Sequence, residues 1–260
     1  MSERSGPEHP QLPPAYRLVA LDTVDSTNSE AWRRAEQGAE DGTLVWAREQ
    51  TEARGRRGRR WVSGSGNLFF SLVLRPECSP HEAAQLGFAA ALALGDAIGS
   101  VAPPMIEVRY KWPNDVLLND RKGAGILMES KMRGDGVEWV ILGIGVNLCS
   151  HPEDLDPPAT SLYFEGCPSS VAPVDLLESF ARHFMTWVNR WLDDGFAPIR
   201  QAWLSHARGL GEAIRVNLPK ETLDGRFKDL DSDGTLVLEQ PDGRIRKIAA
   251  GDVYFVDQSE

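Results

Sequence analysis

The sequence predicts an α+β protein in which a large domain of strands and helices is followed by a small β-barrel. Residues 16–210 contain strand-like and helix-like stretches, whereas residues 212–258 contain only short β-like runs separated by the turn sequences LDGR, DSDG and PDGR. The chain has 260 residues, which is enough for two such domains. We therefore expect a flexible N-terminal tail over residues 1–15, a large domain over 16–210 and a small domain over 211–260.

Hydrophobic spacing assigns the individual elements. Apolar, β-rich runs predict strands at 16–24, 43–48, 67–74, 106–111, 123–130 and 137–148. Helical spacing predicts helices at 27–37, 80–98, 174–192 and 196–210. Thr27 and Glu30 have the spacing of a capping box, which opens the first helix. A polar turn near 134–136 would pair the last two strands of the large domain, and residues 150–173 predict a loop because they are rich in Pro, Ser and acidic groups.

The charge distribution is uneven. The net charge of the chain is −10, which argues against a general nucleic-acid-binding protein, since such proteins usually carry a basic surplus. Residues 48–60 nevertheless hold six arginines and two glutamates. One concentrated basic segment on an acidic protein favours a local anion site over an extended electrostatic track.

Composition also limits where in the cell the protein is expected and which metals it could bind. No apolar run approaches the roughly 20 residues that span a bilayer, and the polar, Pro-rich N-terminus has no signal-peptide core. Cys78, Cys149 and Cys167 are odd in number and fit neither a disulfide framework nor a zinc site, and the five histidines lack metal-binding spacing. We expect a cytoplasmic protein with reduced thiols, no membrane association and no transition metal.

A polar cluster, Asp25-Ser26-Thr27-Asn28, lies where the first predicted strand meets the first predicted helix. Its Ser, Thr and Asn side chains offer several hydrogen-bond donors and acceptors within one turn. A urea-like group, with two N–H donors and one C=O acceptor, requires such a set. The same residues also fit a plain helix cap, so the cluster alone leaves both interpretations open.

Residues 50–61 (QTEARGRRGRRW) form an Arg/Gly loop that could bind an anion. Guanidinium groups pair bidentately with carboxylate and phosphate oxygens, and Gly55 and Gly58 let the backbone approach a ligand closely. These properties suit a mobile lid over an adenylate. The segment is no P-loop, because GxxxxGK[ST] is absent. A solvated basic loop and a nucleic-acid contact through Trp61 remain the alternatives.

Two further segments have the features of a ligand site. In residues 111–115 (KWPND) a strand ends near Pro113, which places the carboxylate of Asp115 at the strand end. Lys122, next to two glycines, offers a point charge suited to a carboxylate that attacks phosphorus. The small residues of 143–147 (GIGVN), in an otherwise bulky strand, indicate close approach of a ligand or of another strand. Charged surface turns and tight packing are the plain alternatives.

The order of these segments adds to their individual signals. The sequence has DSTN, then Q-x-x-x-R-G-R-x-G-R-x-W, then KWPND followed by RK-x-x-G-I-L, then GIGVN. Over about residues 16–260 it resembles the biotin protein ligase family, with one departure: the family's usual Gly-Arg-Gly is Ala53-Arg54-Gly55 here. The resemblance implies a mixed β-sheet flanked by helices, as in class II synthetases, and a C-terminal SH3-like domain.

The resemblance also implies a set of site residues. It places biotin against Ser26, Thr27, Asn28, Gln50, Arg54, Gly55, Arg56, Lys122 and Gly125. It places the nucleotide and its phosphates against Arg57, Arg59, Trp61 and Asn147. Lys122 and Arg56 would screen the repulsion between two anionic reactants, and Asp115 would position the Arg/Gly loop or a magnesium ion.

The implied activity is a ligase reaction. Biotin and ATP, with Mg²⁺, would give biotinyl-5′-adenylate, and the biotinyl group would pass to a lysine of a biotin carboxyl carrier protein. The enzyme would be a monomer or a homodimer. Some family members carry an N-terminal DNA-binding domain, but only about 15 residues precede the first predicted strand, so we expect no DNA binding. A lipoyl or octanoyl ligase and an RNA-contacting protein are the two alternative functions.

Overall fold

The computed structural model describes residues 10–155 and 157–255. Its large sheet consists of β1 (Arg17–Val24), β2 (Thr43–Gln50), β3 (Leu68–Leu74), β4 (Val108–Lys111), β5 (Asp115–Leu118), β6 (Arg121–Arg133) and β7 (Gly136–Val146). The strand order is β1-β2-β3-β7-β6-β5-β4. β1 and β2 are parallel and the other pairs are antiparallel, so the predicted mixed sheet is confirmed.

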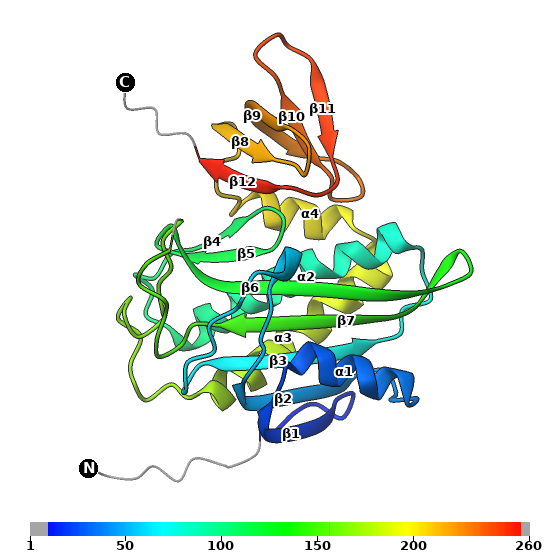
Figure 1. Ribbon diagram of the computed structural model, residues 1–260, viewed down its shortest axis with the longest axis vertical. Helices are drawn as coiled ribbons and strands as arrows, with labels where there is room; N and C mark the ends of the chain where they lie inside the picture. The colour runs from blue at the N-terminus through cyan, green and yellow to red at the C-terminus, as the bar shows by residue number, and fades with distance from the viewer. Residues whose placement is uncertain (1–9, 156, 256–260) are drawn as a thin grey trace.

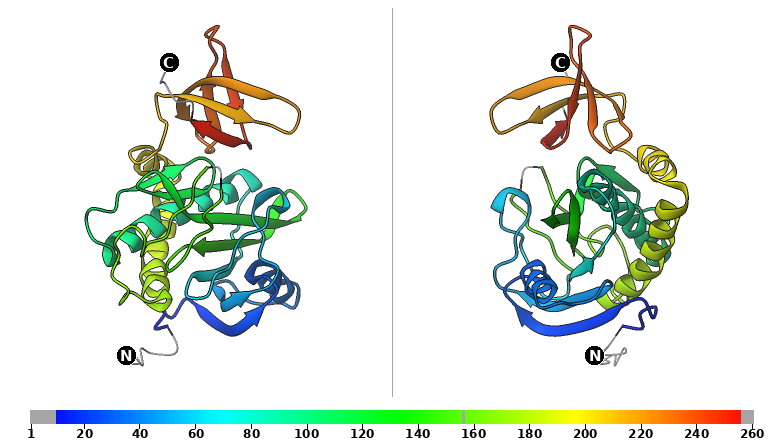
Figure 2. Two further views of the ribbon diagram at one scale, coloured as in Figure 1. Left: turned by 60° about the vertical axis from the view of Figure 1, so that its left-hand side comes forward. Right: turned by 90° about the vertical axis from the view of Figure 1, so that its right-hand side faces the viewer.

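Helices cover both faces of this sheet (Figures 1 and 2). α1 (Thr27–Glu36) packs on one face, where Ala31 and Ala35 contact Val45 and Ile141. α2 (Pro80–Val101) and α3 (Pro173–Asp194) pack on the other face and, with α4 (Ala197–Leu204), enclose the main core. The alternation of side chains along each strand explains the division, because neighbouring residues point to opposite faces.

α2 is a core helix despite its composition. Its length and mean hydropathy of 1.4 would by themselves allow it to cross a membrane, so the stretch is more apolar than the sequence reading allowed. In the structure 67% of its most apolar window is buried. Ser79 and Glu82 form the capping box that starts the helix, and Pro80 occupies its first turn.

The small domain is a five-stranded antiparallel sheet. Its strands are β8 (Ala213–Asn217), β9 (Thr222–Leu230), β10 (Leu236–Glu239), β11 (Ile245–Ile248) and β12 (Asp252–Phe255), in the order β11-β10-β9-β8-β12. It lies beyond β4 and β5, next to α4 (Figure 1). Trp112 Nε1 donates a hydrogen bond of 3.1 Å to Gly234 O, and Arg200 Nε donates one of 2.7 Å to Leu230 O. These bonds dock the small sheet on the large domain.

Several sequence predictions of local structure were wrong. The helix predicted over 196–210 ends at Leu204, and β5 was not predicted because its four residues follow directly on a turn. Thr27 is not a helix cap: the N-cap is Ser26, without a side-chain capping bond, and Glu30 pairs with Arg33 and Arg34.

The predicted N-terminal tail lies partly outside the described residues, which begin at residue 10. The described part of it contacts α3: Gln11 N donates a hydrogen bond of 2.6 Å to Glu178 Oε1. The boundary that we predicted between residues 210 and 211 lies between the end of α4 at Leu204 and the start of β8 at Ala213, and stays a prediction.

Candidate active site

A cavity of about 280 Å³ opens beside β6 and β7, between α1, the Arg/Gly loop and the small sheet. Every site residue named from the sequence lines it, with the exception of Arg57. Segments separated by more than 100 residues therefore meet in one place. The lining also includes Asp252, which was not predicted from the sequence, and four residues of the KWPND and GIGVN segments to which the sequence assigned no individual role: Lys111, Asn114, Gly143 and Gly145.

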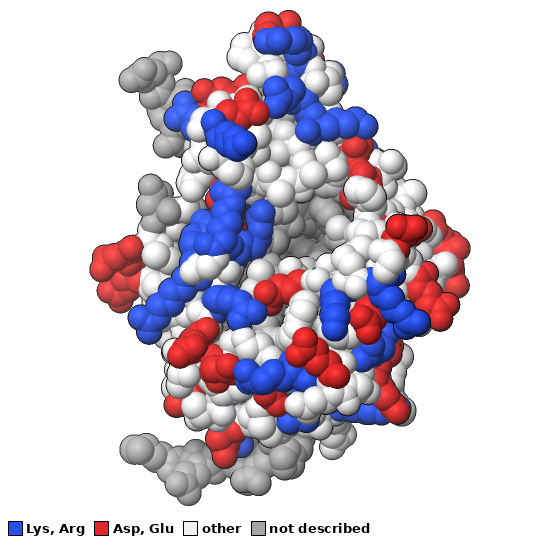
Figure 3. Space-filling view, turned by 45° about the vertical axis from the view of Figure 1, so that its right-hand side comes forward, with Lys and Arg blue, Asp and Glu red and all other residues white. Residues whose placement is uncertain are grey.

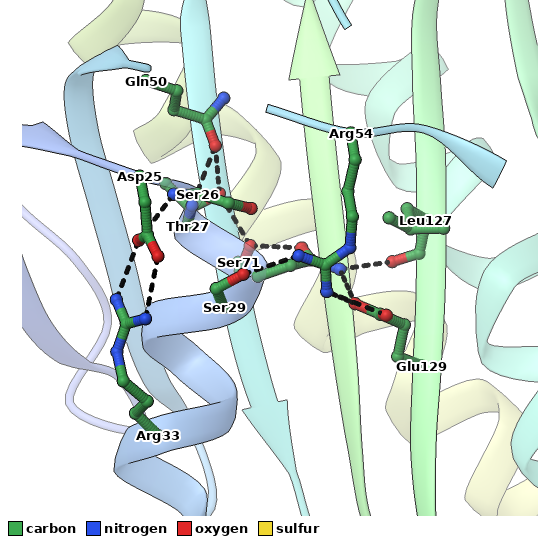
Figure 4. A network of polar contacts seen from close by, with 11 residues as sticks. Asp25, Ser26, Thr27, Ser29, Arg33, Gln50, Arg54, Ser71, Leu127 and Glu129 are labelled. Carbon is green, nitrogen blue, oxygen red and sulfur yellow. Dashed lines mark hydrogen bonds and ion pairs between the residues drawn. The ribbon is translucent and has the colours of Figure 1, made fainter. Parts of the chain in front are cut away.

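The polar cluster forms one end of the cavity (Figure 4). Thr27 donates to Gln50 Oε1 through both its backbone N, at 2.8 Å, and its Oγ1, at 3.1 Å. Ser71 Oγ lies within hydrogen-bond distance of Thr27 Oγ1 and of Asn28 Oδ1. Ser26, Thr27 and Asn28 are buried, so their polar atoms are held in fixed directions. Ser71 was missed, although a hydroxyl inside the apolar run NLFFSLVL was an available signal.

Glu129 organises the next part of this end (Figure 4). Arg54 Nη2 donates to both of its carboxylate oxygens, at 2.8 and 2.9 Å, and Arg54 Nη1 donates to Ser29 Oγ at 2.6 Å. Asn28 Nδ2 donates to Glu129 Oε2 at 2.9 Å. The charge of Arg54 is therefore paired with that of Glu129, and hydrogen bonds from both of its terminal nitrogens fix the guanidinium. No local pattern in the sequence pointed to Glu129, which lies 75 residues beyond Arg54.

Two glycines make room for the cavity floor. Gly143 faces Asn28, and a Cβ at position 143 would collide with Asn28 Oδ1. Gly145, which pairs with Gly125 across β6 and β7, faces the ring of Trp61, and a Cβ at position 145 would lie 2.8 Å from that ring. The close-approach interpretation of the GIGVN segment is thus the one that the geometry supports.

The cationic end of the cavity follows along the same strands. Lys122 Nζ lies 2.6 Å from Asp115 Oδ1 and 5.5 Å from the centroid of the Trp61 ring. Asp115 thus contacts the ammonium of Lys122. Asn147 is buried and donates through Nδ2 to Thr160 O at 3.0 Å, which ties the following loop to the strand.

The Arg/Gly loop crosses the cavity and reaches the small sheet. Arg57 Nη1 lies 2.8 Å from Asp252 Oδ2, and Arg59 Nη2 lies 2.9 Å from Asp252 Oδ1. Arg56 is less exposed and donates to Asn114 Oδ1 at 3.1 Å. Burial lowers the pKa of Arg56, and the charge of Asp252 opposes that shift. The counter-charge for the loop thus comes from the C-terminal sheet.

Cationic groups predominate in the lining. Its basic residues are Arg54, Arg56, Arg59, Arg60, Lys111 and Lys122, and its acidic residues are Asp115 and Asp252. Lys111 is buried against the rings of Tyr254 and Phe255, and desolvation lowers its pKa. Figure 3 shows Lys and Arg side chains gathered along one edge of a hollow in the surface. Such a surplus favours an anionic ligand.

The register of β6 and β7 orders these groups. Along β7 the cavity meets Asn28 at Gly143 and Trp61 at Gly145, and directly after the strand it meets Asn147, whose Nδ2 lies 3.5 Å from Lys122 O. Residues two apart share a face of a strand, so these three positions span about 13 Å at roughly 3.3 Å per residue. A ligand lying along them would meet neutral polar groups, then an aromatic ring, then positive charge.

Comparisons with known proteins identify the family of the chain. The sequence matches the biotin/lipoate A/B protein ligase family over residues 60–205 and the biotin protein ligase C-terminal domain over residues 209–256. It is 45% identical over 239 residues to a biotin–[acetyl-CoA-carboxylase] ligase of Paracoccus denitrificans, covering 90% of this chain and 99% of the relative.

More distant relatives belong to the same family. The chain is 34% identical to the Mycobacterium tuberculosis biotin–[acetyl-CoA-carboxylase] ligase, over 92% of this chain and 89% of that one. A solved structure of biotin protein ligase from Aquifex aeolicus in complex with biotin and ATP superposes with a TM-score of 0.75 and 28% identity, covering 92% of this chain and 98% of that one. The cavity, the fold and these matches together establish that the chain belongs to the biotin protein ligase family.

Proposed function

We propose that this chain is a biotin–[acetyl-CoA-carboxylase] ligase, which activates biotin with ATP and transfers the biotinyl group to a lysine of a carrier protein. The observation that carries the proposal is the order of chemistry along β6 and β7. The neutral polar end suits the urea-like head of biotin, the aromatic middle suits its apolar rings and chain, and the cationic end suits a carboxylate beside phosphates.

In the first step an oxygen of the biotin carboxylate bonds to the α-phosphorus of ATP. The bond from that phosphorus to the oxygen that bridges to the β-phosphate breaks, and pyrophosphate leaves. Both reactants are anions, so their approach requires fixed positive charge. Lys122 and Arg56 supply it, and Asp115 holds the Lys122 ammonium in place through the 2.6 Å contact. Alignment of the two reactants contributes the rest of the acceleration.

In the second step the amine of a carrier lysine attacks the carbonyl carbon of the adenylate. A new C–N bond forms, the amine loses a proton, and AMP leaves with the electron pair of the broken C–O bond. The mixed anhydride hydrolyses readily, so exclusion of water matters until the carrier arrives. The Arg/Gly loop, which crosses the cavity, would provide that cover.

Magnesium enters this scheme with ATP. Among the described residues no group of three or more His, Cys, Asp or Glu side chains is placed to hold a metal. Mg²⁺ usually binds through substrate phosphates, waters and one or two carboxylates rather than through an all-protein cage. Asp115 is the cavity carboxylate nearest Lys122 and would be available to complete the shell of an ion carried by the nucleotide.

Lipoate or octanoate is the alternative substrate, because the family that matches residues 60–205 includes lipoate ligases. The polar cluster and the match of residues 209–256 to the biotin protein ligase C-terminal domain favour biotin. An RNA-contacting role has less support, because Arg54 is paired with Glu129 and Arg57 with Asp252. We further propose a cytoplasmic monomer or homodimer that does not bind DNA.

Calorimetric titration tests the ligand assignment. Biotin is expected to bind the free protein, and the heat and affinity are expected to change when ATP is present, because the adenylate forms. Biotin affinity should change little with salt, whereas nucleic-acid binding would weaken steeply. Binding of lipoate or octanoate without binding of biotin would move the chain to the lipoyl class.

A further inference from the structure

Asp252 is the point at which the small sheet meets the Arg/Gly loop. It is the first residue of β12, and only 17% of its side chain is exposed. Its two carboxylate oxygens receive Arg57 and Arg59 at 2.8 and 2.9 Å, and Arg56 Nη1 lies 3.9 Å away. One carboxylate from the C-terminal domain thus lies within 4 Å of three arginines of a loop about 195 residues earlier in the chain.

The contacts of Arg57 differ from those of Arg56, whereas Arg59 both lines the cavity and pairs with Asp252. Arg57 does not line the cavity. Its side chain contacts Asp252 and so connects the loop to the small sheet. Arg56 lines the cavity, has the longest of the three distances to Asp252, and also donates to Asn114 and to Gly251 O. The guanidinium of Arg56 therefore stays available to a phosphate while Arg57 connects the loop to the small sheet.

The backbone at this point also requires support. Arg57 has a φ of 58°, in the left-handed region that non-glycine residues adopt only at a cost in energy. Such a conformation persists where surrounding contacts fix it. The ion pair with Asp252 is the contact of the Arg57 side chain that does so.

We propose that Asp252 is a positioning residue that latches the Arg/Gly loop onto the small sheet through Arg57, and thereby retains the reaction intermediate in the cavity. The proposal rests on the proposed function, since it assigns the latch to the adenylate that this function produces. The role assigned to Asp252 runs through Arg57, which fixes the loop that holds Arg56 over the cavity. The C-terminal domain thereby controls how long the cavity stays covered.

A different role for the same contact makes the opposite prediction. If Asp252 were a competitor that occupied the arginines until ATP displaced it, removal of its charge would strengthen nucleotide binding. The KM for ATP in Asp252→Asn would then fall. A latch predicts that this KM stays the same or rises.

The test compares Asp252→Asn, Arg57→Gln, the double variant and the conservative Asp252→Glu with wild type. Asp224→Asn is the matched control, because Asp224 is an exposed carboxylate of the same sheet that pairs with Arg215 away from the loop. Two rates are measured: hydrogen exchange of the amides of residues 53–61 without ligand, and dissociation of preformed biotinyl-5′-adenylate.

Asp252→Asn and Arg57→Gln are each expected to speed both rates by roughly three- to tenfold, as loss of a partly buried charge pair implies. The double variant should be no faster than Asp252→Asn, because Arg57→Gln removes only a pair that Asp252→Asn already breaks. Asp252→Glu should restore most of the wild-type behaviour, and Asp224→Asn should match wild type.

Unchanged rates in both single variants, additive effects in the double variant, or a lower KM for ATP in Asp252→Asn would overturn the latch. Hydrogen exchange needs no ligand, so it tests whether Asp252 fixes the Arg/Gly loop even if the wild type forms no adenylate. If the wild-type protein forms no adenylate, that result would instead contradict the proposed function.

Discussion

Lys122 and Asp115 form an ion pair, with Nζ 2.6 Å from Oδ1, at the end of the cavity where positive charge predominates. They come from adjacent strands, β6 and β5, so the sheet itself sets their separation. The carboxylate limits where the ammonium can point, and the nearby ring of Trp61 restricts it further. We expect an ammonium held in this way to act on the anionic reactants without rearranging first.

Lys122→Met should abolish adenylate formation and leave the fold intact. The substitution keeps most of the side-chain stem and removes the charge that offsets two anions. Loss of one preorganised group of this kind costs about 2.7–4 kcal/mol of barrier, or roughly 10²–10³ in rate. Single-turnover formation of the adenylate measures the effect. Lys131→Met, on the same strand but outside the cavity, is the control, and a wild-type rate for Lys122→Met would make Lys122 a surface residue.

Gly143→Ala should weaken biotin binding by roughly tenfold or more, the effect expected when a methyl group is forced into a packed site. The new Cβ would collide with Asn28 Oδ1 and displace the side chain that bonds Ser71 and Glu129. Calorimetry measures the affinity. Gly99→Ala is a matched control, since a Cβ at position 99 of α2 meets nothing within 4 Å. Equal biotin affinity in the two variants would show that the polar end does not bind biotin.

Arg56→Gly should weaken retention of the adenylate more than its synthesis. Lys122 would remain to assist the attack, whereas the lost guanidinium contact would speed escape of the intermediate. Escaped mixed anhydride reacts with any accessible lysine, so the variant should biotinylate bystander proteins. A streptavidin blot of a reaction that contains albumin measures this. Labelling at the wild-type level, with synthesis intact, would contradict a retention role for Arg56.

The sequence was sufficient for the features that depend on local patterns. β-rich runs and helical spacing located most of the strands and helices, because burial of one face imposes its period on the residues. The capping-box prediction at Thr27 was wrong for a functional reason. Thr27 bonds Gln50 and Ser71, so its hydroxyl serves the cavity rather than the helix end.

Contacts between distant segments were beyond the sequence reading. Glu129 and Asp252 belong to no local motif. Their role as counter-charges appears only when the fold brings each of them to an arginine of the Arg/Gly loop. From the sequence, the loop arginines lacked a counter-charge and suggested a freely mobile lid. The structure supplies two carboxylates, one of them from the other domain. Charge pairing across domains is set by topology, which short-range patterns do not encode.

The measurement that tests the central claim most directly is exchange of labelled pyrophosphate into ATP by the purified protein. Reversible formation of an adenylate is required for exchange, so the acid that supports it identifies the substrate. We predict exchange with biotin and none without an added acid. Exchange that depends on lipoate or octanoate, and not on biotin, would contradict the assignment.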